Sequence, residues 1–562
     1  MTIYTRGGYA LPGSSLAFKT GTWRVQKPRH VHAAAPCHAV CPAGEDAQAW
    51  LAKVDEGDAQ AAWRTLVSVN PLPAVTGRVC PHPCESACNR GDMDAPIAIH
   101  AVERYLGDEA IRNGWDFGLA PPPADARQVA VIGAGPGGLT AAYHLLKRGL
   151  RPVLFDKNPT AGGTLLTAIP SYRLPRDVLN AEVEHLLSLP IEYRPRTILG
   201  REVSLDELRQ QYAAIILAPG QQKPRPWSVD GVTPKDLHEG LTLLEGWNGH
   251  QSAPAPYSAA VVGAGNTAID VARVLKRAGV TEVHVISHKA KPGPGVPEDD
   301  VMPALAREIT QAEEEGIRIH EHRGVRRLLL RGERVVGVEM VHMKKLRRAN
   351  GRLARVAFDG TETVLHVDQV IPAVGQVLDT RGFEGLLGGQ GWFDLDDVMR
   401  VAGQRNVFVA GDAGGNAGTV TAAVGQGRVA AAAVAQLLRG EDPVIEAPRL
   451  GVPYAQLNVH YHEPAPRVVE RVLPVAERGE CDEVDLGLDR HEVEAESRRC
   501  LSCGNCMACD NCWTLCPDSA VLKTQEIASD GSHYVFDYDY CKGCGLCAAE
   551  CPCGYIEMIE DL

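Results

Sequence analysis

The sequence predicts an α/β fold: two nested, doubly wound dinucleotide-binding domains lie between a helical N-terminal domain and a small α+β C-terminal domain. Two glycine-rich turns, at 133–138 and 263–268, each join an apolar strand to a helix, as at the start of a doubly wound unit. The chain has 562 residues, too many for one hydrophobic core. Its 17 cysteines fall only between 37 and 88 and between 481 and 553, so the two ends differ chemically from the middle.

The composition excludes several classes of protein. Hydrophobic content of 45% and charged content of 23% are ordinary for a globular chain. No apolar run is long enough to span a membrane. Residues 1–8 lack the apolar core of a signal peptide, which favours a cytoplasmic location. The net charge of −13 argues against nucleic acid as a partner.

The first glycine-rich turn has the pattern of a dinucleotide site. Val129–Ile132 read as a buried strand, and a helix follows the glycines directly. The glycines make the bend, let the backbone approach a pyrophosphate and let the helix pack on the strand. A second strand ends on Asp156, about 20 residues further on, where a ribose hydroxyl needs a carboxylate acceptor. This context argues against a plain glycine-rich loop. The predicted site residues are Gly133, Gly135, Pro136, Gly137, Gly138 and Asp156.

A second fingerprint follows the strand Ala260–Val262. Its next strand, Val283–Ile286, ends without an acid, on Ser287-His288-Lys289. A carboxylate there favours NAD, whereas cationic groups accommodate the 2′-phosphate of NADP. The pair therefore favours NADPH over NADH, although no arginine fork follows the strand; the alternative is a solvated basic strand end. The predicted site residues are Gly263, Gly265, Asn266, Thr267, Ala268, His288 and Lys289.

The order of these motifs predicts the domain boundaries. The second fingerprint is inserted inside the first domain, because the chain returns to strand-like and helical patterns after it. Proline-studded sequence then predicts a linker over the surface. The expected domains are residues 1–125, helical and metal-binding; 126–255 and 373–440, the first nucleotide-binding domain; 256–372, the second; 441–495, the linker; and 496–562, the C-terminal domain.

The cysteine spacing predicts metal centres rather than disulfides. A disulfide scaffold would not leave the largest domains without cysteine. The tail carries two copies of C-x2-C-x2-C-x3-C-P, the run that binds two [4Fe–4S] clusters and exchanges the fourth cysteine between them. This pattern is far more specific than the two cysteine pairs of a zinc ribbon. One predicted ligand set is Cys506, Cys509, Cys512 and Cys551; the other is Cys541, Cys544, Cys547 and Cys516.

The other cysteines are less clearly assigned by their spacing. The N-terminal groups Cys37-x3-Cys41 and Cys80-x3-Cys84-x3-Cys88 suit an iron–sulfur cluster or zinc. Four cysteines of the tail are left over, and they could be spare thiols, packing residues or part of a further site: Cys481, Cys500, Cys503 and Cys553.

Up to about residue 440 the chain resembles the small, NADPH-oxidising subunit of glutamate synthase. The same module occurs in dihydropyrimidine dehydrogenase and in the transhydrogenase that bifurcates electrons between NADPH and ferredoxin. The resemblance implies that the first fingerprint, with Gly163, binds FAD and that the second binds NAD(P)H. It also implies that Gly411 and Asp412 contact the FAD and that nicotinamide stacks on the flavin. The matching motifs are Asn70-Pro71-x-Pro73, Gly77-Arg78-Val79-Cys80-Pro81, Cys84-Glu85-x-x-Cys88, both glycine loops, Gly162-Gly163, Ile169-Pro170, Met302-Pro303 and Gly411-Asp412.

One departure from that family concerns its N-terminal clusters. The family has two more cysteines shortly before the position of Cys37, so one of two clusters is expected to be lost here. Cys37 and Cys88 match the ligands of the lost cluster. By resemblance, the remaining [4Fe–4S] cluster is expected on Cys41, Cys80, Cys84 and, from the following helix, Glu103. The alternative draws all four ligands from the five N-terminal cysteines.

The second departure is the tail, which the glutamate synthase subunit lacks. It resembles the ferredoxin-like subunits of 2-oxoacid:ferredoxin oxidoreductases. We therefore expect an NAD(P)H-dependent oxidoreductase that exchanges electrons, through FAD and [4Fe–4S] clusters, with ferredoxin or with a catalytic oxidoreductase subunit in a hetero-oligomeric complex. That subunit would be a 2-oxoacid or aromatic-ring oxidoreductase. No catalytic acid or base is predicted, because the cofactors carry the chemistry. The alternatives are a glutamate synthase small subunit and an assembly scaffold with unused nucleotide sites.

Overall fold

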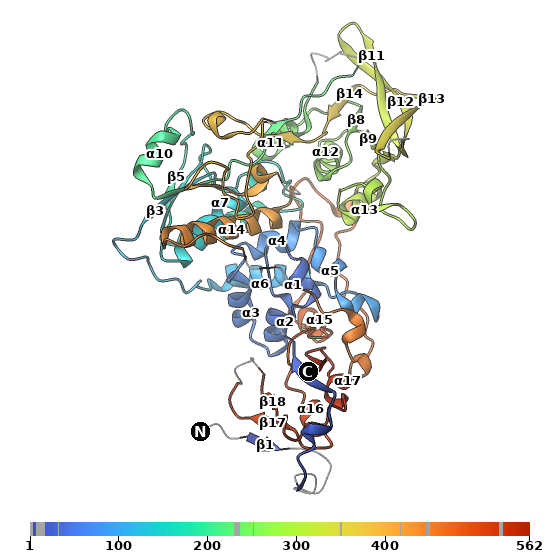
Figure 1. Cartoon of the computed structure of the whole chain (residues 1–562). Coiled ribbons are helices and arrows are strands. Elements are labelled where there is room, and N and C mark those ends of the chain that lie inside the picture. Colours follow the sequence, from blue (N-terminus) through green and yellow to red (C-terminus); the bar gives the residue numbers. More distant parts are fainter. Residues whose placement is uncertain are drawn as a thin grey trace.

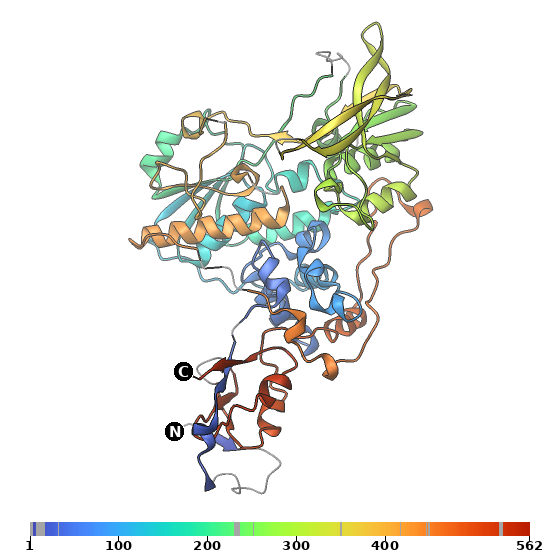
Figure 2. The same cartoon turned by 45° about the vertical axis from the view of Figure 1, so that its right-hand side comes forward.

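The computed structural model describes residues 4–6, 17–31, 33–229, 237–250, 252–348, 351–389, 391–415, 418–445, 447, 450–527 and 532–561. Residues 1–8, which lack the pattern of a signal peptide, are only partly covered, because residues 1–3 and 7–8 lie outside these ranges. Two nucleotide-binding domains lie at one end of the molecule, the helical domain in the middle and the C-terminal domain at the other end (Figures 1 and 2).

The first nucleotide-binding domain consists of β3 (Gln128–Ile132), α7 (Pro136–Lys147), β4 (Arg151–Phe155), α8 (Thr164–Thr167), α9 (Arg176–Leu187), β5 (Glu192–Arg194), α10 (Leu205–Gln211), β6 (Ala214–Leu217), β16 (Val407–Val409), η6 (Gly411–Gly414) and α14 (Val420–Leu438). Its parallel sheet has the order β16-β6-β3-β4-β5. The strand β3, which leads into the first glycine-rich turn, lies at the centre, and α7 packs against α14. The predicted doubly wound architecture is confirmed.

The second domain consists of α11 (Gly240–His250), β8 (Ser258–Val262), α12 (Asn266–Arg277), β9 (Glu282–Ile286), η4 (Glu298–Asp300), α13 (Ala306–Glu314), β10 (Arg318–His320) and β14 (Gln369–Pro372). Its parallel sheet has the order β10-β9-β8-β14. The boundary expected at 256 is too late, because α11 packs on α12 and shares its apolar core. The return of the chain through β14 agrees with the boundary near 372.

An antiparallel sheet of three long strands projects from the second domain (Figure 1). Two successive hairpins form it from the strands β11 (Arg323–Arg331), β12 (Arg334–Arg347) and β13 (Leu353–Leu365). Two short paired strands, β7 (Lys223–Pro224) and β15 (Gln376–Val377), connect the domains, and η5 (Glu384–Leu386) follows.

A buried arginine holds the two nucleotide-binding domains together. Arg173, just before α9, pairs with Asp270 of α12 at 2.8 Å and with Glu308 of α13 at 3.0 Å. All three side chains are buried, so removing one partner would leave an uncompensated charge. The contact restricts the orientation of one domain on the other.

The helical domain consists of α1 (Pro36–Val40), α2 (Ala47–Asp55), α3 (Ala59–Val67), α4 (Pro73–Val79), α5 (Pro83–Ser86), η3 (Asn89–Asp92) and α6 (Ile99–Asn113). It docks on the first nucleotide-binding domain through α4, whose first turn donates to a buried carboxylate. The backbone N–H groups of Ala74 and Val75 lie 2.7 and 2.9 Å from the oxygens of Glu182 on α9. Pro42 meets α14 so closely that only a glycine, Gly425, fits opposite its carbonyl.

The C-terminal domain consists of β1 (Tyr4–Arg6), η2 (Thr20–Trp23), β2 (Gln26–His30), α16 (Asn511–Thr514), β17 (Val521–Thr524), β18 (Tyr534–Phe536), α17 (Leu546–Ala549) and β19 (Ile556–Glu560). Here the expected helical domain of 1–125 needs correction. The strands β1 and β2 complete the sheets β1-β17-β18 and β19-β2, so the chain start belongs to the C-terminal domain. Spacing patterns could not reveal this pairing, since its partners lie more than 500 residues apart.

The segment expected as a linker runs back along the molecule (Figure 2) and is anchored at several points. It contains η7 (Tyr454–Gln456), η8 (Val459–Tyr461), η9 (Val475–Glu477) and the start of α15 (Arg490–Ser497), which packs on α2 and α6. Arg478 pairs with Glu315 of the second domain at 3.2 Å. Glu470 reaches His100 of α6 at 2.5 Å. No helix in the described ranges is long and apolar enough to cross a membrane.

Candidate functional site

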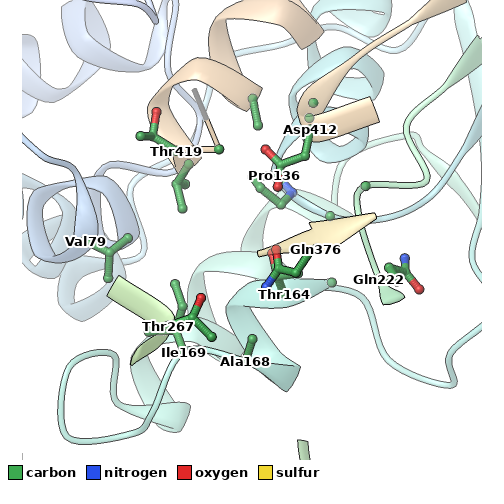
Figure 3. A pocket seen from close by; sticks show the side chains of 18 of the residues that line it. Val79, Pro136, Thr164, Ala168, Ile169, Gln222, Thr267, Gln376, Asp412 and Thr419 are labelled. Carbon is green, nitrogen blue, oxygen red and sulfur yellow. The ribbon is translucent and has the colours of Figure 1, made fainter. Parts of the chain in front are cut away.

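A cavity that is partly open to solvent lies where three domains meet (Figure 3). Its walls come from both glycine loops and from the helical domain. In Figure 3, Val79 of α4, Pro136 of the first loop and Thr267 of the second loop border the same space. The predicted residues that line it are Gly133, Gly135, Pro136, Gly137, Asp156, Gly163, Asn266, Thr267, Gly411 and Asp412.

The first loop forms a cradle that side chains would fill. Gly163 has a φ of +55°, and a Cβ there would lie 2.8 Å from the Cα of Gly135. Gly138 is packed more tightly, with 1.8 Å from a built Cβ to the carbonyl oxygen of Gly133. No side chain caps α7, so its first N–H groups remain available to an anion. The cradle fits a pyrophosphate.

Asp156 follows β4 and lies at the edge of the same cavity. Its Oδ2 accepts from the N–H of Ala134 at 2.6 Å, and its Oδ1 from the N–H of Asn158 at 2.7 Å. Burial raises the pKa of the Asp156 carboxyl, and the two N–H donors partly offset this effect. Each oxygen can still accept a further bond, so the side chain can hold a ribose hydroxyl.

Gly411 and Asp412 begin η6, directly after β16, on the opposite wall. Gly411 has a φ of +72°, and its backbone approaches Gly137 of the first loop. Burial raises the pKa of Asp412. The fold thus brings together residues that lie about 275 positions apart, as the resemblance implied.

The second loop presents only its opening turn to the cavity. Thr267 and Asp270 of α12 line the wall, and Asn266 uses its Oδ1 to accept from the N–H of Leu305 at 2.9 Å. Gly263 is packed against the carbonyl of Ala373. No side chain caps α12, so its N-terminus also suits a phosphate. Gly263, Gly265, Ala268, His288 and Lys289 lie outside the cavity lining.

An arginine that was not predicted from the sequence lies beside His288, in the basic segment that follows β9. Arg355 of β13 donates to the backbone carbonyl of His288, and its Nη2 lies 3.1 Å from Oδ1 of Asp300. Burial, followed by the positive charges of Arg355 and Lys289, lowers the pKa of His288. The arginine lies 67 positions beyond His288, so no local pattern could have revealed it.

Three N-terminal cysteines gather around Glu103. Burial, and then Glu103, raise the pKa of Cys80 to about 12, and burial, Cys41 and Cys80 raise that of Cys84. Oε1 of Glu103 accepts from Thr76 and, at 3.3 Å, from Asn70. No partner of its Oε2 is recorded among the described residues. The donor set fits a cluster of four-iron type, and Glu45 also lies beside it.

The tail cysteines separate into the two predicted sets. Cys551 lies beside Cys506 and Cys509, whose pKa values are raised by burial and then by that thiol. Burial, and then Cys516 and Cys541, raise the pKa of Cys547 to about 12. A small cavity lies at the second set, lined by Cys516, Cys541, Cys544 and Cys547. Cys551 thus lies near cysteines of the first run and Cys516 near cysteines of the second, as an exchange of the fourth cysteine requires; the ligand sets stay a prediction.

None of the 17 cysteines forms a disulfide, and none belongs to the nucleotide-binding domains. This excludes a redox disulfide beside the central cavity. Cys481 is exposed, whereas Cys553 is buried and contacts the sulfur of Cys551 at 3.8 Å.

Comparison with known proteins gives three matches to family models. Residues 127–427 match the pyridine nucleotide-disulphide oxidoreductase model. Residues 27–115 match the 4Fe-4S cluster domain II of dihydropyrimidine dehydrogenase, and residues 505–555 match the 4Fe-4S dicluster domain.

Several curated relatives span most of the chain. The beta subunit of the NADP(+)-dependent formate dehydrogenase of Moorella thermoacetica is 34% identical over 84% of this chain and 70% of its own length. The beta subunit of the NADPH-Fe(3+) oxidoreductase of Geobacter sulfurreducens is 31% identical over 87% of this chain and 78% of its own. The small chain of the NADPH glutamate synthase of Escherichia coli is 28% identical over 74% of this chain and 91% of its own.

Proposed function

Because the chain belongs to the pyridine nucleotide-disulphide oxidoreductase family, we propose that it passes electrons between NADPH and a separate iron–sulfur or catalytic partner protein. It is an NAD(P)H-dependent oxidoreductase that uses FAD and [4Fe–4S] clusters, with clusters at both ends of the chain. The function is electron transfer, as expected from the sequence.

One observation carries the proposal: a single cavity is bordered by both nucleotide loops and by residues that flank a cluster cysteine. Val79 and Pro81, on either side of Cys80, line the same space as Gly135 and Thr267. A flavin there accepts two electrons from a nicotinamide and can release them one at a time to iron–sulfur centres. The two nucleotide-binding domains and the helical domain therefore meet at the place where electrons would pass from nicotinamide through flavin to a cluster.

The chain's own residues position the cofactors. We assign the pyrophosphate of FAD to the cradle of Gly135 and Gly163 at the N-terminus of α7, and its ribose to Asp156. The N-terminus of α12 is assigned to the phosphates of the nicotinamide nucleotide. Arg173 holds the domains at a fixed orientation through Asp270, which itself lines the cavity. No side chain is assigned as an acid or base.

The choice of NADPH rests on the cationic strand end. His288 and Lys289 follow β9 without a carboxylate, and Arg355 adds a guanidinium beside them. Guanidinium and ammonium groups are suited to a 2′-phosphate, and a guanidinium can bind it with two hydrogen bonds. The named relatives from Moorella and Geobacter use NADP(H) as well.

The partner is proposed to dock at the C-terminal domain. Cys509 and Cys544, one from each tail ligand set, are exposed. The C-terminal domain that carries them lies at the end of the molecule opposite the nucleotide-binding domains (Figure 2). The relatives are subunits of larger assemblies, which supports a partner such as ferredoxin, a 2-oxoacid or aromatic-ring oxidoreductase, or another catalytic subunit.

Anaerobic stopped-flow spectroscopy tests this function. Mixing the purified protein with NADPH should bleach the flavin, and the cluster absorbance should then fall. NADH should react more slowly. Asp156→Ala should contain less FAD and lose the bleaching, while Asp206→Ala, a surface carboxylate paired with Arg209, should behave as the wild type. A flavin that neither nucleotide reduces would overturn the proposal.

A further inference from the structure

Four cysteines without a role in the sites above converge on one place. Cys37 lies in α1 and Cys88 directly before η3, both in the helical domain. Cys500 and Cys503 follow α15, more than 400 residues further along the chain. Cys37 and Cys503 belong to one apolar core, and Cys88 and Cys500 pack against it.

Direct contacts join the two halves of this group. Nδ2 of Asn89, the residue after Cys88, donates to Sγ of Cys503 at 3.4 Å. Nη1 of Arg90 donates to the carbonyl of Arg499, the residue before Cys500, at 3.0 Å. Arg499 in turn pairs with Asp94 at 3.0 Å. The neighbours of Cys88 and of Cys500 therefore hold the two segments together.

The thiols themselves face one another. Burial, and then the neighbouring thiols of Cys500, Cys88 and Cys503, raise the pKa of Cys37. The pKa of Cys500 is raised to about 12 by burial, with Cys503 and Cys88 adding to the effect. Four thiols that disfavour each other's ionisation need a cationic centre if they are to act as thiolates.

The charge around the group suits such a centre. Two buried guanidinium groups, Arg90 and Arg499, lie beside it and lower the pKa values of Cys500 and Cys88 against the effect of burial. A four-iron cluster with four thiolates carries net negative charge, which favours a position beside these arginines; Asp94 and Glu496 balance part of the arginines' own charge.

The spacing of the sulfurs decides between one metal ion and a larger group. Thiolates around one zinc lie about 3.8 Å apart, as tetrahedral bonds of about 2.3 Å require. No three of these four sulfurs lie within 4.8 Å of one another; among the described residues, only His82, Glu85 and His100 form a set that compact. Within the described residues, no three sulfurs of either ferredoxin set lie that close together either.

We propose that a further [4Fe–4S] cluster is bound by four thiolates: Cys37, Cys88, Cys500 and Cys503. Two ligands come from the helical domain and two from the segment that leads into the C-terminal domain. The cluster expected to be lost, for want of two N-terminal cysteines, is instead completed from the tail. The alternative that draws all four ligands of one cluster from the five N-terminal cysteines does not fit this division.

The proposed cluster site lies between the N-terminal cluster site and the ferredoxin clusters. Two short helices each carry one cysteine of this site and one of the site around Glu103. Cys37 lies in α1 and Cys41 follows it, whereas Cys84 lies in α5 and Cys88 follows it. The proposed site is therefore adjacent to the one around Glu103. On its other side, the N–H of Gly504 donates to the carbonyl of Cys553, beside the first ferredoxin set, at 2.7 Å. The site bridges the two cluster regions, and that role, unlike the binding itself, rests on the proposed electron transfer.

Iron and acid-labile sulfide analysis of anaerobically purified full-length protein tests the proposal. Four clusters require about sixteen iron atoms per chain, whereas three require about twelve. The double variant Cys500→Ala with Cys503→Ala should fall to about twelve and lose one of the spins seen by electron paramagnetic resonance after full reduction. The control Cys481→Ala, which removes an exposed cysteine of the same segment, should keep about sixteen.

Two further readouts keep the test decisive if the double variant does not fold. The iron content of the wild-type protein alone overturns the proposal if it stays near twelve, and so does one zinc per chain. The single variant Cys503→Ser should keep most of the iron but change one spin signal. FAD content and bleaching by NADPH should remain normal in these variants, so failure of the proposed function and failure of this site are measured separately.

Discussion

The guanidinium of Arg355 donates a hydrogen bond to the backbone carbonyl of His288, 67 positions earlier in the chain. The contact places an arginine from the projecting β-sheet at the strand end where an NADP 2′-phosphate is expected. Replacing Arg355 with alanine should therefore raise the KM for NADPH by about tenfold or more, because a charge-assisted hydrogen bond contributes about 1.5–3 kcal/mol.

The KM for NADH should hardly change in Arg355→Ala, since NADH lacks the phosphate. Arg326→Ala is the matched control, because it removes an arginine of the same sheet that pairs with Asp359 and Glu362. Steady-state kinetics with both nucleotides gives the comparison. An equal effect of Arg355→Ala on both would show that the side chain only supports the fold.

Gly163 should not tolerate a side chain. Alanine there would place its Cβ 2.8 Å from the Cα of Gly135, in the cradle assigned to FAD. Gly163→Ala should therefore lower the FAD content of the purified protein and weaken rebinding of FAD about tenfold or more, a loss of about 1.4 kcal/mol or more. Absorbance and fluorescence titration with FAD measure both quantities.

Gly149→Ala separates this effect from backbone strain alone. Gly149 has a similar positive φ of +74°, but nothing lies within 4 Å of a built Cβ. This variant should lose about 1 kcal/mol of stability and keep its FAD. If both variants lose FAD equally, the close approach in the cradle does not decide binding.

Glu103 should be required for one N-terminal cluster. Its carboxyl is buried, and Thr76 and Asn70 donate to one of its two oxygens. Glu103→Ala should lose about four iron atoms per chain, while Glu103→Cys should retain them with an altered spin signal, because thiolate is the usual ligand. Glu109→Ala, on the same helix and paired with Arg112, should leave the iron content unchanged. Full iron in Glu103→Ala would remove Glu103 from the ligand set.

His100 should make the stability depend on pH. Burial alone would lower its pKa, but hydrogen bonds to Glu470 and Glu85 outweigh this and raise the pKa to about 9. Because the folded pKa exceeds the ordinary value near 6.5, the stabilisation is complete below about 6.5 and is lost as pH rises through about 9. It amounts to about 3 kcal/mol if each pKa unit counts about 1.4 kcal/mol.

His100→Gln tests this dependence. Its apparent unfolding midpoint at a fixed scan rate should lie well below that of the wild type at pH 7. The difference should shrink toward pH 10, where the wild-type imidazole is neutral too. The exposed His491 provides a control, since His491→Gln should follow the wild type throughout. A difference that stays constant from pH 7 to 10 would contradict the charged state of His100.

Much of the fold follows from local pattern. Strands that run into Gly133 and Gly263 and the helices that follow were predicted, because each forms from residues adjacent in the chain. The doubled ferredoxin run likewise predicts its own ligand exchange, and the fold places Cys516 and Cys551 where that exchange needs them. The expected cofactors, FAD, NADP and [4Fe–4S] clusters, agree with the family matches.

Other features depend on contacts between distant segments. The chain start pairs with β17 and β19, which shifts the expected domain boundary. The helix α11 joins the second domain, since its apolar face fits α12. No sequence motif marks the strands that pair with the chain start or the helix that packs on α11. Edge pairing and helix packing require only residues that are extended or apolar, and such residues are common throughout the chain.

The sequence by itself determined the cofactor chemistry, since the spacing of glycines and cysteines within short runs sets the local backbone and ligand geometry. Only the tertiary structure decided where that chemistry lies. It brought Val79 beside both nucleotide loops, Arg355 beside His288, and Cys37 and Cys88 beside Cys500 and Cys503. These associations depend on how packed domains bury their faces against one another, which spacing along the chain does not encode.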